Sequence, residues 1–358
     1  MLSRACALFC LAFAPALAQA PAPIVITDME NREVRLARPA ERVASIPIPM
    51  ASTLIALDGS PRRLVGINPV ARSAIEEGIL GRIFPEARRI PADITGANFV
   101  PNIEALAARR PDLVIQWGGR GPDIVQPITN AGLTAMLIVY GTEANARRYM
   151  HDAATAIGRA DRVPPLVTWR AEVQARIAAI SDTIPDAQRP RVLHLQRALS
   201  GLVAAGADPN IYNHFTLELA GGRNVAQGLR GFTPVNAEQV AAWDPEVILL
   251  NSFEAALTPA FIYNHPILSL TRAARTQRVF KMPLGGYRWD PPNQESPLAW
   301  MWLATLLHPD RFSFDLRAEM RAAYRTLYGH ELTPAETDEI LRIGTQRSAA
   351  YDAIFRAR

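Results

Sequence analysis

The chain has 358 residues, of which 49% are hydrophobic and 20% are charged. These values are typical of a globular protein and exclude a disordered or fibrous one, and the length leaves room for two lobes. The formal net charge is +4, from 38 basic and 34 acidic residues, and this near balance argues against a nucleic-acid partner.

The N-terminal residues have the pattern of a secretory signal peptide. Arg4 precedes an apolar stretch over 5–14, and residues 16–18 read Ala-Leu-Ala, a small-x-small cleavage site. The pattern predicts a signal peptide over 1–18 and therefore export to the periplasm. No later segment contains ~18 consecutive apolar residues, so no transmembrane helix is predicted.

Both cysteines of the chain, Cys6 and Cys10, lie inside this segment. Lipid attachment needs a small residue before the modified Cys, and Phe9 stands there instead. We therefore expect a periplasmic protein that is not lipidated. Its mature part would contain no disulfide, no thiolate metal site and no Cys nucleophile.

Short apolar runs alternate with helical patterns after the signal peptide, and we assign residues 19–160 to an N-terminal α/β lobe. Runs of this kind, bounded by turn residues, are typical of strands buried on both faces. Their alternation with helices favours a mostly parallel, doubly wound sheet. The strand candidates are 24–27, 34–36, 43–46, 64–67, 113–116 and 135–139.

A long helix is predicted over 161–185, between the two halves of the chain. Pro164 and Pro165 stand in its first turn, the pattern runs to about Ile184, and Pro185 ends it. Some 20 helical residues span ~30 Å, which is long enough to bridge two lobes.

A second α/β lobe is predicted over 186–308, and a helical extension follows over 309–358. The extension contains helical patterns at 314–328 and 334–346, and the sequence suggests no function for it. The strand candidates of the second lobe are 191–195, 202–205, 247–250 and 278–280.

Residues 102–115 and 236–249 carry the same pattern. Each segment begins with Asn, has Glu two places later and Ala-Ala after it, and ends with Pro, an acid and an apolar strand. The leading Asn residues predict helix N-caps, which places Glu104 and Glu238 in first turns, where the helix dipole stabilises a carboxylate. Stabilisation of the helix start explains why an acid stands at each position. It explains less well why the same acid, Glu, recurs at the same place in both halves.

Four motifs occur in a specific order: Asn102–Ile115, Ala220–Ala226, Asn236–Val247 and Arg278–Phe280. In this order they resemble the substrate-binding proteins of the ferric-siderophore, haem and cobalamin class of ABC importers, also called class III. The resemblance covers residues 24–308. It implies two Rossmann-like lobes with mostly parallel sheets, joined by one long rigid helix, with a ligand cleft between them.

The resemblance also implies partners and docking residues. The partner would be a permease dimer with its ATPase, and the binding protein would be a monomer without a permanently bound cofactor. In this class one surface Glu on each lobe meets Arg residues of the permease, and the motif positions carry this role to Glu104 and Glu238. Such opposite-charge pairs fix orientation more than they add affinity.

Ligand-binding residues are expected in the loops at the carboxyl ends of the strands. These loops are rich in arginines and aromatic residues, which suit the charged oxygens and flat faces of an anionic chelate such as a ferric siderophore. A packing or solvent-exposed role is equally open for each residue taken singly. The candidates are Arg72, Trp117, Arg120, Arg197, Tyr212, His214, Tyr287, Arg288 and Trp289.

The remaining chemistry leaves several alternatives. Tyr212 or His214 could ligate iron in haem or in an incomplete chelate, whereas the His spacing does not predict a bare Zn²⁺ or Mn²⁺ site. No nucleophile elbow, phosphate loop or metalloprotease His pair is present, so we do not predict an enzyme. The alternatives are a haem, cobalamin or nickel or cobalt chelate ligand, a sensor protein, and an exported chelatase using His214 and Glu254.

Overall fold

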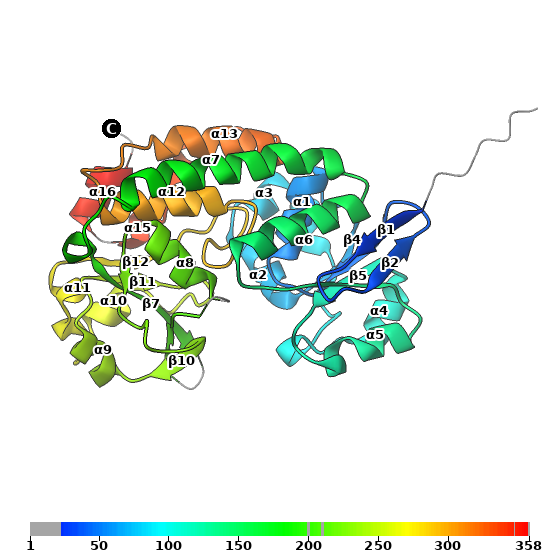
Figure 1. Ribbon diagram of the computed structural model, residues 1–358, viewed down its shortest axis with the longest axis horizontal. Helices are drawn as coiled ribbons and strands as arrows, with labels where there is room; N and C mark the ends of the chain where they lie inside the picture. The colour runs from blue at the N-terminus through cyan, green and yellow to red at the C-terminus, as the bar shows by residue number, and fades with distance from the viewer. Residues whose placement is uncertain (1–22, 199–200, 209–210, 347, 357–358) are drawn as a thin grey trace, which may run out of the picture.

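The computed structural model describes residues 23–198, 201–208, 211–346 and 348–356. The predicted signal peptide, residues 1–18, lies outside the described residues. The described chain forms two α/β lobes, each with its own sheet, and a layer of long helices runs along both (Figure 1). None of the helices in this part of the chain is long and apolar enough to cross a membrane.

The N-terminal lobe is built on a parallel sheet with the strand order β4-β3-β5-β6. Its central strands, β3 and β5, are buried along their whole length, as the apolar runs predict for strands covered by helices on both faces. An antiparallel hairpin of β1 (Ile24–Thr27) and β2 (Glu33–Leu36) precedes this sheet. The strands are β3 (Val43–Ser45), β4 (Leu64–Ile67), β5 (Leu113–Trp117) and β6 (Ala135–Ile138). The helices are α1 (Met50–Asp58), α2 (Pro69–Glu77), α3 (Leu80–Ile83), α4 (Ile103–Arg109), α5 (Gln126–Asn130) and α6 (Glu143–Ala156).

The C-terminal lobe has a mixed sheet with the order β10-β8-β7-β11-β12, and β9 also pairs with β7. β7, β11 and β12 are parallel, whereas β8 and β10 are antiparallel to their neighbours. The sequence did not predict β9 or β10. The strands are β7 (Arg191–Ala198), β8 (Gly201–Ala205), β9 (Arg223–Asn224), β10 (Phe232–Val235), β11 (Val247–Leu250) and β12 (Val279–Lys281). The helices are α8 (Tyr212–Leu219), α9 (Ala237–Trp243), α10 (Pro259–Tyr263) and α11 (Arg272–Arg275).

The repeated sequence forms the same helix–strand unit in both lobes. The side chains of Asn102 and Asn236 accept hydrogen bonds from backbone N–H groups three residues later, at 3.2 and 2.7 Å, which confirms both predicted N-caps. α4 and α9 then end at residues with left-handed backbone conformation, Arg110 at φ 45° and Asp244 at φ 41°. The sequence duplication is therefore a structural duplication.

The acid that follows the repeated Pro ties each unit to the neighbouring strand. Asp112 accepts a hydrogen bond from the backbone N–H of Arg42 at 3.1 Å, and Glu246 accepts one from that of Arg191 at 3.0 Å. The side chains of the same two arginines donate to carbonyls at the ends of α4 and α9. These bonds satisfy backbone groups that a helix end leaves unpaired.

The lobes are joined by α7 (Val163–Ser181), which lies where the long connecting helix was predicted and ends three residues before Ile184. Arg170, fully buried at the middle of α7, makes a two-pronged ion pair with Glu143 of α6, at 2.8 and 2.5 Å. Tyr212 of α8 donates a hydrogen bond to the same carboxylate at 3.1 Å. One buried network therefore connects helices of both lobes through α7.

The C-terminal helices add a second connection between the lobes. α12 (Ser296–Leu307) packs along α7, and α13 (Leu316–Tyr328) packs against both α12 and α1 of the N-terminal lobe (Figure 1). The helix predicted over 334–346 is divided into α14 (Pro334–Ile340) and α15 (Ile343–Gln346), because Arg342 has a left-handed backbone at φ 56°. The chain continues into α16 (Ala349–Phe355).

A buried carboxylate holds the loop before α12 against α13. Glu295 accepts hydrogen bonds from the backbone N–H of Gly286 at 2.9 Å and from Trp289 Nε1 at 2.7 Å. The hydroxyls of Tyr324 and Tyr328 donate to it as well, at 3.2 and 2.5 Å. A Cβ at Gly286 would collide with this carboxylate and with the Tyr328 hydroxyl, which explains the glycine.

Candidate ligand-binding cleft

A cavity of about 600 Å³ lies between the two lobes. Its walls come from segments at the carboxyl ends of β3, β5 and β6 in one lobe and of β7 and β11 in the other, as the rule for open α/β sheets predicts. The N-terminal lobe contributes Ile48, Phe99, Trp117, Arg120 and Tyr140. The C-terminal lobe contributes His194, Gln196, Arg197, Asn213, Phe232, Asn251, Phe253 and Asp290, among others.

The N-terminal wall is an aromatic cluster that carries one arginine. Trp117, the last residue of β5, meets Phe99 and Tyr140 edge to face, with ring centroids 6.0 Å apart in both pairs. The guanidinium of Arg120 lies 4.7 Å from the centroid of Phe99 and 5.5 Å from that of Trp117. Aromatic faces attract a cation and orient it, so this arginine is held at the cavity by rings.

The opposite wall carries a second arginine in a similar setting. Arg197, near the end of β7, lies 5.4 Å from the ring centroid of Phe261. Arg120 and Arg197 are both exposed, and within the described residues neither forms an ion pair with a carboxylate. Burial raises the pKa of the nearby Glu254 carboxyl in spite of the charge on Arg197. The cavity therefore has on each side an arginine that forms no ion pair among the described residues.

The floor of the cavity is polar and already paired. Asp290 accepts a hydrogen bond from the backbone N–H of Ser252 at 3.1 Å and another from its hydroxyl. Its carboxylate lies 3.3 Å from Nε2 of His194, and the Asn213 amide lies 3.0 Å from the same nitrogen. Burial alone would raise the pKa of Asp290, but the neighbouring His194 and the hydrogen bonds from Ser252 bring it below its ordinary value. This carboxylate is occupied by protein donors.

The predicted ligand residues fall into two groups. Trp117, Arg120 and Arg197 line the cavity together. Arg72 pairs with Glu76 at 3.4 Å on α2, outside the cavity lining.

The other candidates make contacts inside the protein. Tyr212 belongs to the network of Arg170 and Glu143, and Tyr287 is fully buried, which raises the pKa of its hydroxyl. His214 is partly buried, with Nδ1 3.5 Å from the Asn224 amide.

Arg288 and Trp289 hold the loop before α12 in place. Arg288 donates to the carbonyl of Ser252 in its own lobe and to Glu77 of α2, at 2.9 Å, in the other lobe. Trp289 donates to Glu295. Both side chains are buried, and Arg288 is an inter-lobe contact rather than part of the cavity lining.

The two repeat acids lie at the surface. Glu104 and Glu238 are exposed in the first turns of α4 and α9. Both helices lie on the side of the lobes away from α7 (Figure 1). Their role in docking stays a prediction.

Sequence reasoning missed several cavity residues. Tyr140 lies within two residues of β6, so the strand-end rule could have selected it. Asn251 directly follows β11 and lies in one of the loops that this rule selects, but it was not chosen among the candidates. Phe99 and Phe232 do not follow a parallel strand, and that rule gives no signal for them. Within the described residues, no group of three or more His, Cys, Asp or Glu side chains could hold a metal ion.

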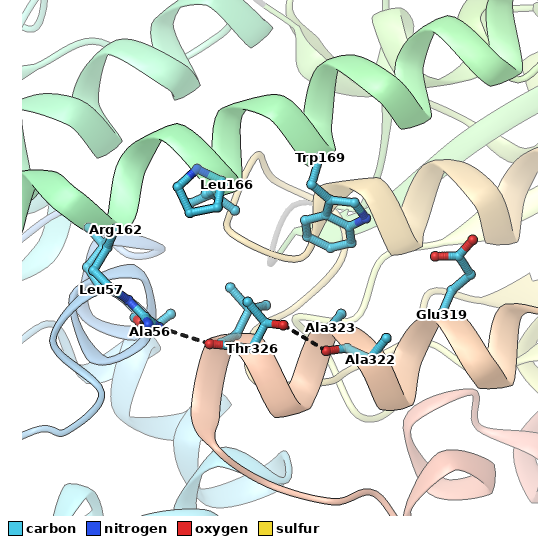
Figure 2. Close-up of a pocket in the computed structure, with 11 residues that line it drawn as sticks. Ala56, Leu57, Arg162, Leu166, Trp169, Glu319, Ala322, Ala323 and Thr326 are labelled. Carbon is cyan, nitrogen blue, oxygen red and sulfur yellow. Dashed lines mark hydrogen bonds between the residues drawn. The ribbon is translucent and has the colours of Figure 1, made fainter.

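A second hollow of about 330 Å³ lies between α1, α7 and α13 (Figure 2). Trp169 and Leu166 of α7 face the Ala322, Ala323 and Thr326 side of α13 across it. It shares no lining residue with the cavity between the lobes. Its mostly apolar lining offers little to recognise an anion.

Comparison with known proteins identifies similar sequences. Residues 94–284 match the sequence profile of a family described as periplasmic binding protein. The chain is 29% identical over 230 residues to a cobalamin-binding protein of Halobacterium salinarum, covering 59% of this chain and 60% of that protein. It is 25% identical over 352 residues to the molybdate-binding protein MolA of Haemophilus influenzae, covering 92% and 96%.

Solved structures share the fold. A periplasmic solute-binding protein from Veillonella parvula superposes with a TM-score of 0.82 at 30% identity, over 92% of this chain and all of that one. MolA in its molybdate-bound form superposes with a TM-score of 0.76 at 22% identity, over 86% and 99%.

Proposed function

Because the chain belongs to the periplasmic binding protein family, we propose that it is the binding protein of an ABC importer and that it captures an anionic metal chelate between its lobes. The observation that carries this proposal is the pair of arginines, Arg120 and Arg197, that face one cavity from opposite lobes without carboxylate partners among the described residues. An anion between them would be attracted to both lobes at once.

The two arginines favour a ligand that is negatively charged and that presents oxygen atoms as hydrogen-bond acceptors. A guanidinium is always protonated and presents a planar set of N–H donors that suits carboxylate, catecholate or other oxygen anions. The described residues provide no cluster that could bind a bare metal ion. The metal would therefore enter inside a chelate whose own oxygen atoms meet the protein.

The size and walls of the cavity favour a chelate with flat faces. The volume of about 600 Å³ is within the usual range for a small-molecule site. Trp117, Phe99 and Tyr140 on one side and Phe232 and Phe253 on the other offer stacking surface. A ferric siderophore has this combination of charged oxygens and planar groups. Haem, cobalamin and nickel or cobalt chelates are the related alternatives.

A molybdate-like oxyanion is the second candidate. The similarity to the molybdate-binding protein MolA extends over nearly the full length of both chains. The same two arginines would suit a compact oxyanion, although it would leave most of the aromatic wall without a contact. The two candidates differ in whether the aromatic residues contribute to affinity.

Delivery to a membrane permease completes the proposal. Glu104 and Glu238, exposed at equivalent helix starts, would meet basic residues of the permease dimer. The predicted signal peptide and the family both support a periplasmic location. The relatives named above are binding proteins rather than enzymes, which supports transport over the chelatase alternative.

Ligand titration tests this function. Tryptophan fluorescence would be followed while ferric 2,3-dihydroxybenzoate, ferric citrate, haem, cyanocobalamin, nickel–histidine and molybdate are added separately, because Trp117 lies in the cavity wall. We expect a ferric chelate to bind most tightly, and Arg120→Ala and Arg197→Ala each to raise its Kd by about tenfold or more. Tight molybdate binding would select the second candidate.

Arg35→Ala is the matched control, because Arg35 is exposed on β2 and pairs with Glu33 away from the cavity. It should leave every Kd unchanged. Saturable chelate binding that survives the double substitution of Arg120 and Arg197 would remove the basis of the proposal.

A further inference from the structure

The repeat extends further toward the N-terminus than its helix-start motif. Residues 99–104 read Phe-Val-Pro-Asn-Ile-Glu, and residues 232–238 read Phe-Thr-Pro-Val-Asn-Ala-Glu. In both lobes a Phe is followed two places later by Pro, then by the N-cap Asn and the exposed Glu. The lobes differ by one inserted residue, Val235.

These two phenylalanines line the cavity from opposite lobes. Phe99 belongs to the aromatic wall beneath Arg120, and Phe232 begins β10 on the other side. Phe232 is 44% exposed, unlike the buried floor residues His194 and Asp290. In Figure 1, β10 lies on the side of its lobe away from α7, as α4 and α9 do. Each short segment therefore runs from the cavity wall to a repeat acid.

Both segments are firmly attached to their lobes. The carbonyl of Phe99, whose backbone is left-handed at φ 64°, accepts a hydrogen bond from the buried Gln116 at 3.0 Å. The backbone of Asn102 donates to Ile94 at 2.9 Å, and its amide donates to Asp93 at 3.1 Å. A displacement of Phe99 is therefore expected to move the start of α4 with it.

The segment in the other lobe is held as part of the sheet. Phe232 pairs with Ala205 and Val235 with Leu202 in the antiparallel register of β10 and β8. Asn236 follows directly and caps α9. The start of α9 and the backbone of Phe232 therefore belong to one continuous segment of the sheet.

Aromatic rings fix a distance better than the neighbouring arginines do. An arginine side chain has many rotamers and can follow a ligand over a range of separations, whereas a Phe ring is placed by two torsion angles. A ligand in contact with both rings would set how far apart the lobes stand at this side. α7 and α13 join the lobes at the opposite side (Figure 1). A small change in the angle between the lobes at these helices therefore gives a larger displacement at the side of Phe99 and Phe232.

Resting on the function proposed above, we propose that Phe99 and Phe232 are the contacts through which a bound ligand sets the separation between the Glu104 and Glu238 helix starts. The two acids would then present a defined spacing to the permease only when the cavity is filled. The permease could then distinguish the ligand-bound protein from the empty one by the distance between the two acids. It also assigns a function to the Phe at the start of each repeat.

Double electron–electron resonance can measure this separation. Spin labels would be placed at Ala107→Cys on α4 and Gln239→Cys on α9, both exposed positions, in a chain that also carries Cys6→Ser and Cys10→Ser. The probes are the gallium(III) complex of 2,3-dihydroxybenzoate, which is diamagnetic, and molybdate. Saturation is checked by tryptophan fluorescence for every variant.

We expect the gallium chelate to shift the label-to-label distance by about 2 Å or more and to narrow its distribution. Phe99→Ala and Phe232→Ala should raise the Kd by about tenfold, and at saturating chelate the distance should stay that of the empty protein. Phe99→Tyr and Phe232→Tyr should restore the shift. Val100→Ala, which removes an exposed apolar side chain next to Phe99, should behave as the unmodified chain.

The outcomes separate this inference from the proposed function. If the chelate binds but the distance shift persists in both Phe→Ala variants, or is absent in the unmodified chain, the coupling is wrong and the binding function stands. If neither probe binds saturably, and none of the ligands titrated above does, the proposed function fails and the coupling fails with it. A molybdate-induced shift that ignores both Phe residues would also overturn the coupling.

Discussion

At the scale of single residues, the arginines near the lobe interface are of two kinds, those that form an ion pair with a carboxylate and those that form none among the described residues. Arg170 and Arg288 are buried, and each is paired with a carboxylate, because a buried charge without a partner is strongly unfavourable. Arg120 and Arg197 are exposed at the cavity and rest on aromatic rings instead. Residue type alone does not separate the two groups, and this is why Arg288 was selected from the sequence as a ligand residue.

Lys281 gives a residue-scale prediction. This lysine, the only one in the chain, is 2% exposed, and its Nζ donates to the carbonyls of Leu257, at 2.7 Å, and Glu254. Burial lowers the pKa of Lys281 to about 8. NMR of protein labelled at lysine should show a single side-chain resonance that titrates near that value. A midpoint at the ordinary lysine pKa would contradict the burial.

The same shift predicts a pH dependence of stability. The folded pKa lies below the unfolded value of 10.5, so the unfolded chain binds more protons between pH 8 and 10.5. The free energy of unfolding therefore rises with pH across this range. The contribution of Lys281 is fully present above pH 10.5 and is lost as the pH falls from there through about 8. Lys281→Met should remove this part of the pH dependence, as urea unfolding of the two proteins across that range would show.

At the scale of elements, the repeated unit was predictable because its signals are local. An N-cap Asn, an acid in the first turn and a Pro before the next strand act within one short segment, and α4 and α9 formed where they predicted. The loop Tyr287–Trp289 was not predictable in the same way. Trp289 donates to Glu295, and Glu295 in turn accepts hydrogen bonds from two tyrosines of α13, far along the chain. The position of this loop therefore depends on the C-terminal extension.

The edge strand β12 gives an element-scale prediction. The amide of buried Gln346 in α15 accepts a hydrogen bond from the backbone N–H of Lys281 and donates to its carbonyl, both at 2.8 Å. One side chain thus takes the place of a further strand at an edge that would otherwise have unpaired groups. Gln346→Leu should lower the free energy of unfolding by about 1–3 kcal/mol, since two buried backbone groups lose their partners.

Urea unfolding and hydrogen exchange at the Lys281 amide would measure this effect. Gln227→Leu is the control, because Gln227 is exposed. Unchanged stability and unchanged exchange in Gln346→Leu would show that α15 does not stabilise the edge of the sheet.

At the scale of the whole molecule, two lobes are held at one side and left open at the other. α7 and α13 both run along the lobes, and Arg176 of α7 pairs with Glu319 of α13 at 3.1 Å. The sequence predicted α7 as the connection but indicated no role for the extension, because contacts between α13 and α1 join residues more than 250 positions apart. Such contacts leave no local pattern.

The network around Arg170 gives the prediction for the whole molecule. Among the described residues, Arg170→Met leaves the buried Glu143 with the partly exposed Arg147 as its remaining ion-pair partner. We expect the substitution to lower the free energy of unfolding by about 3–5 kcal/mol. Replacing both partners, as Glu143→Leu with Arg170→Met, should restore part of the loss because no buried charge remains.

Burial alone would raise the pKa of Glu143, but Arg170 and Arg147 hold it below its ordinary value. Its stabilising effect is therefore present above the unfolded pKa of 4.5 and is lost as pH falls through the folded one. Urea unfolding at neutral and acid pH would test this, since Arg170→Met should also weaken the loss of stability in acid. Equal stability of the single and double variants would show that the carboxylate does not depend on Arg170, and that the lobes are joined by the packing of α7, α12 and α13 alone.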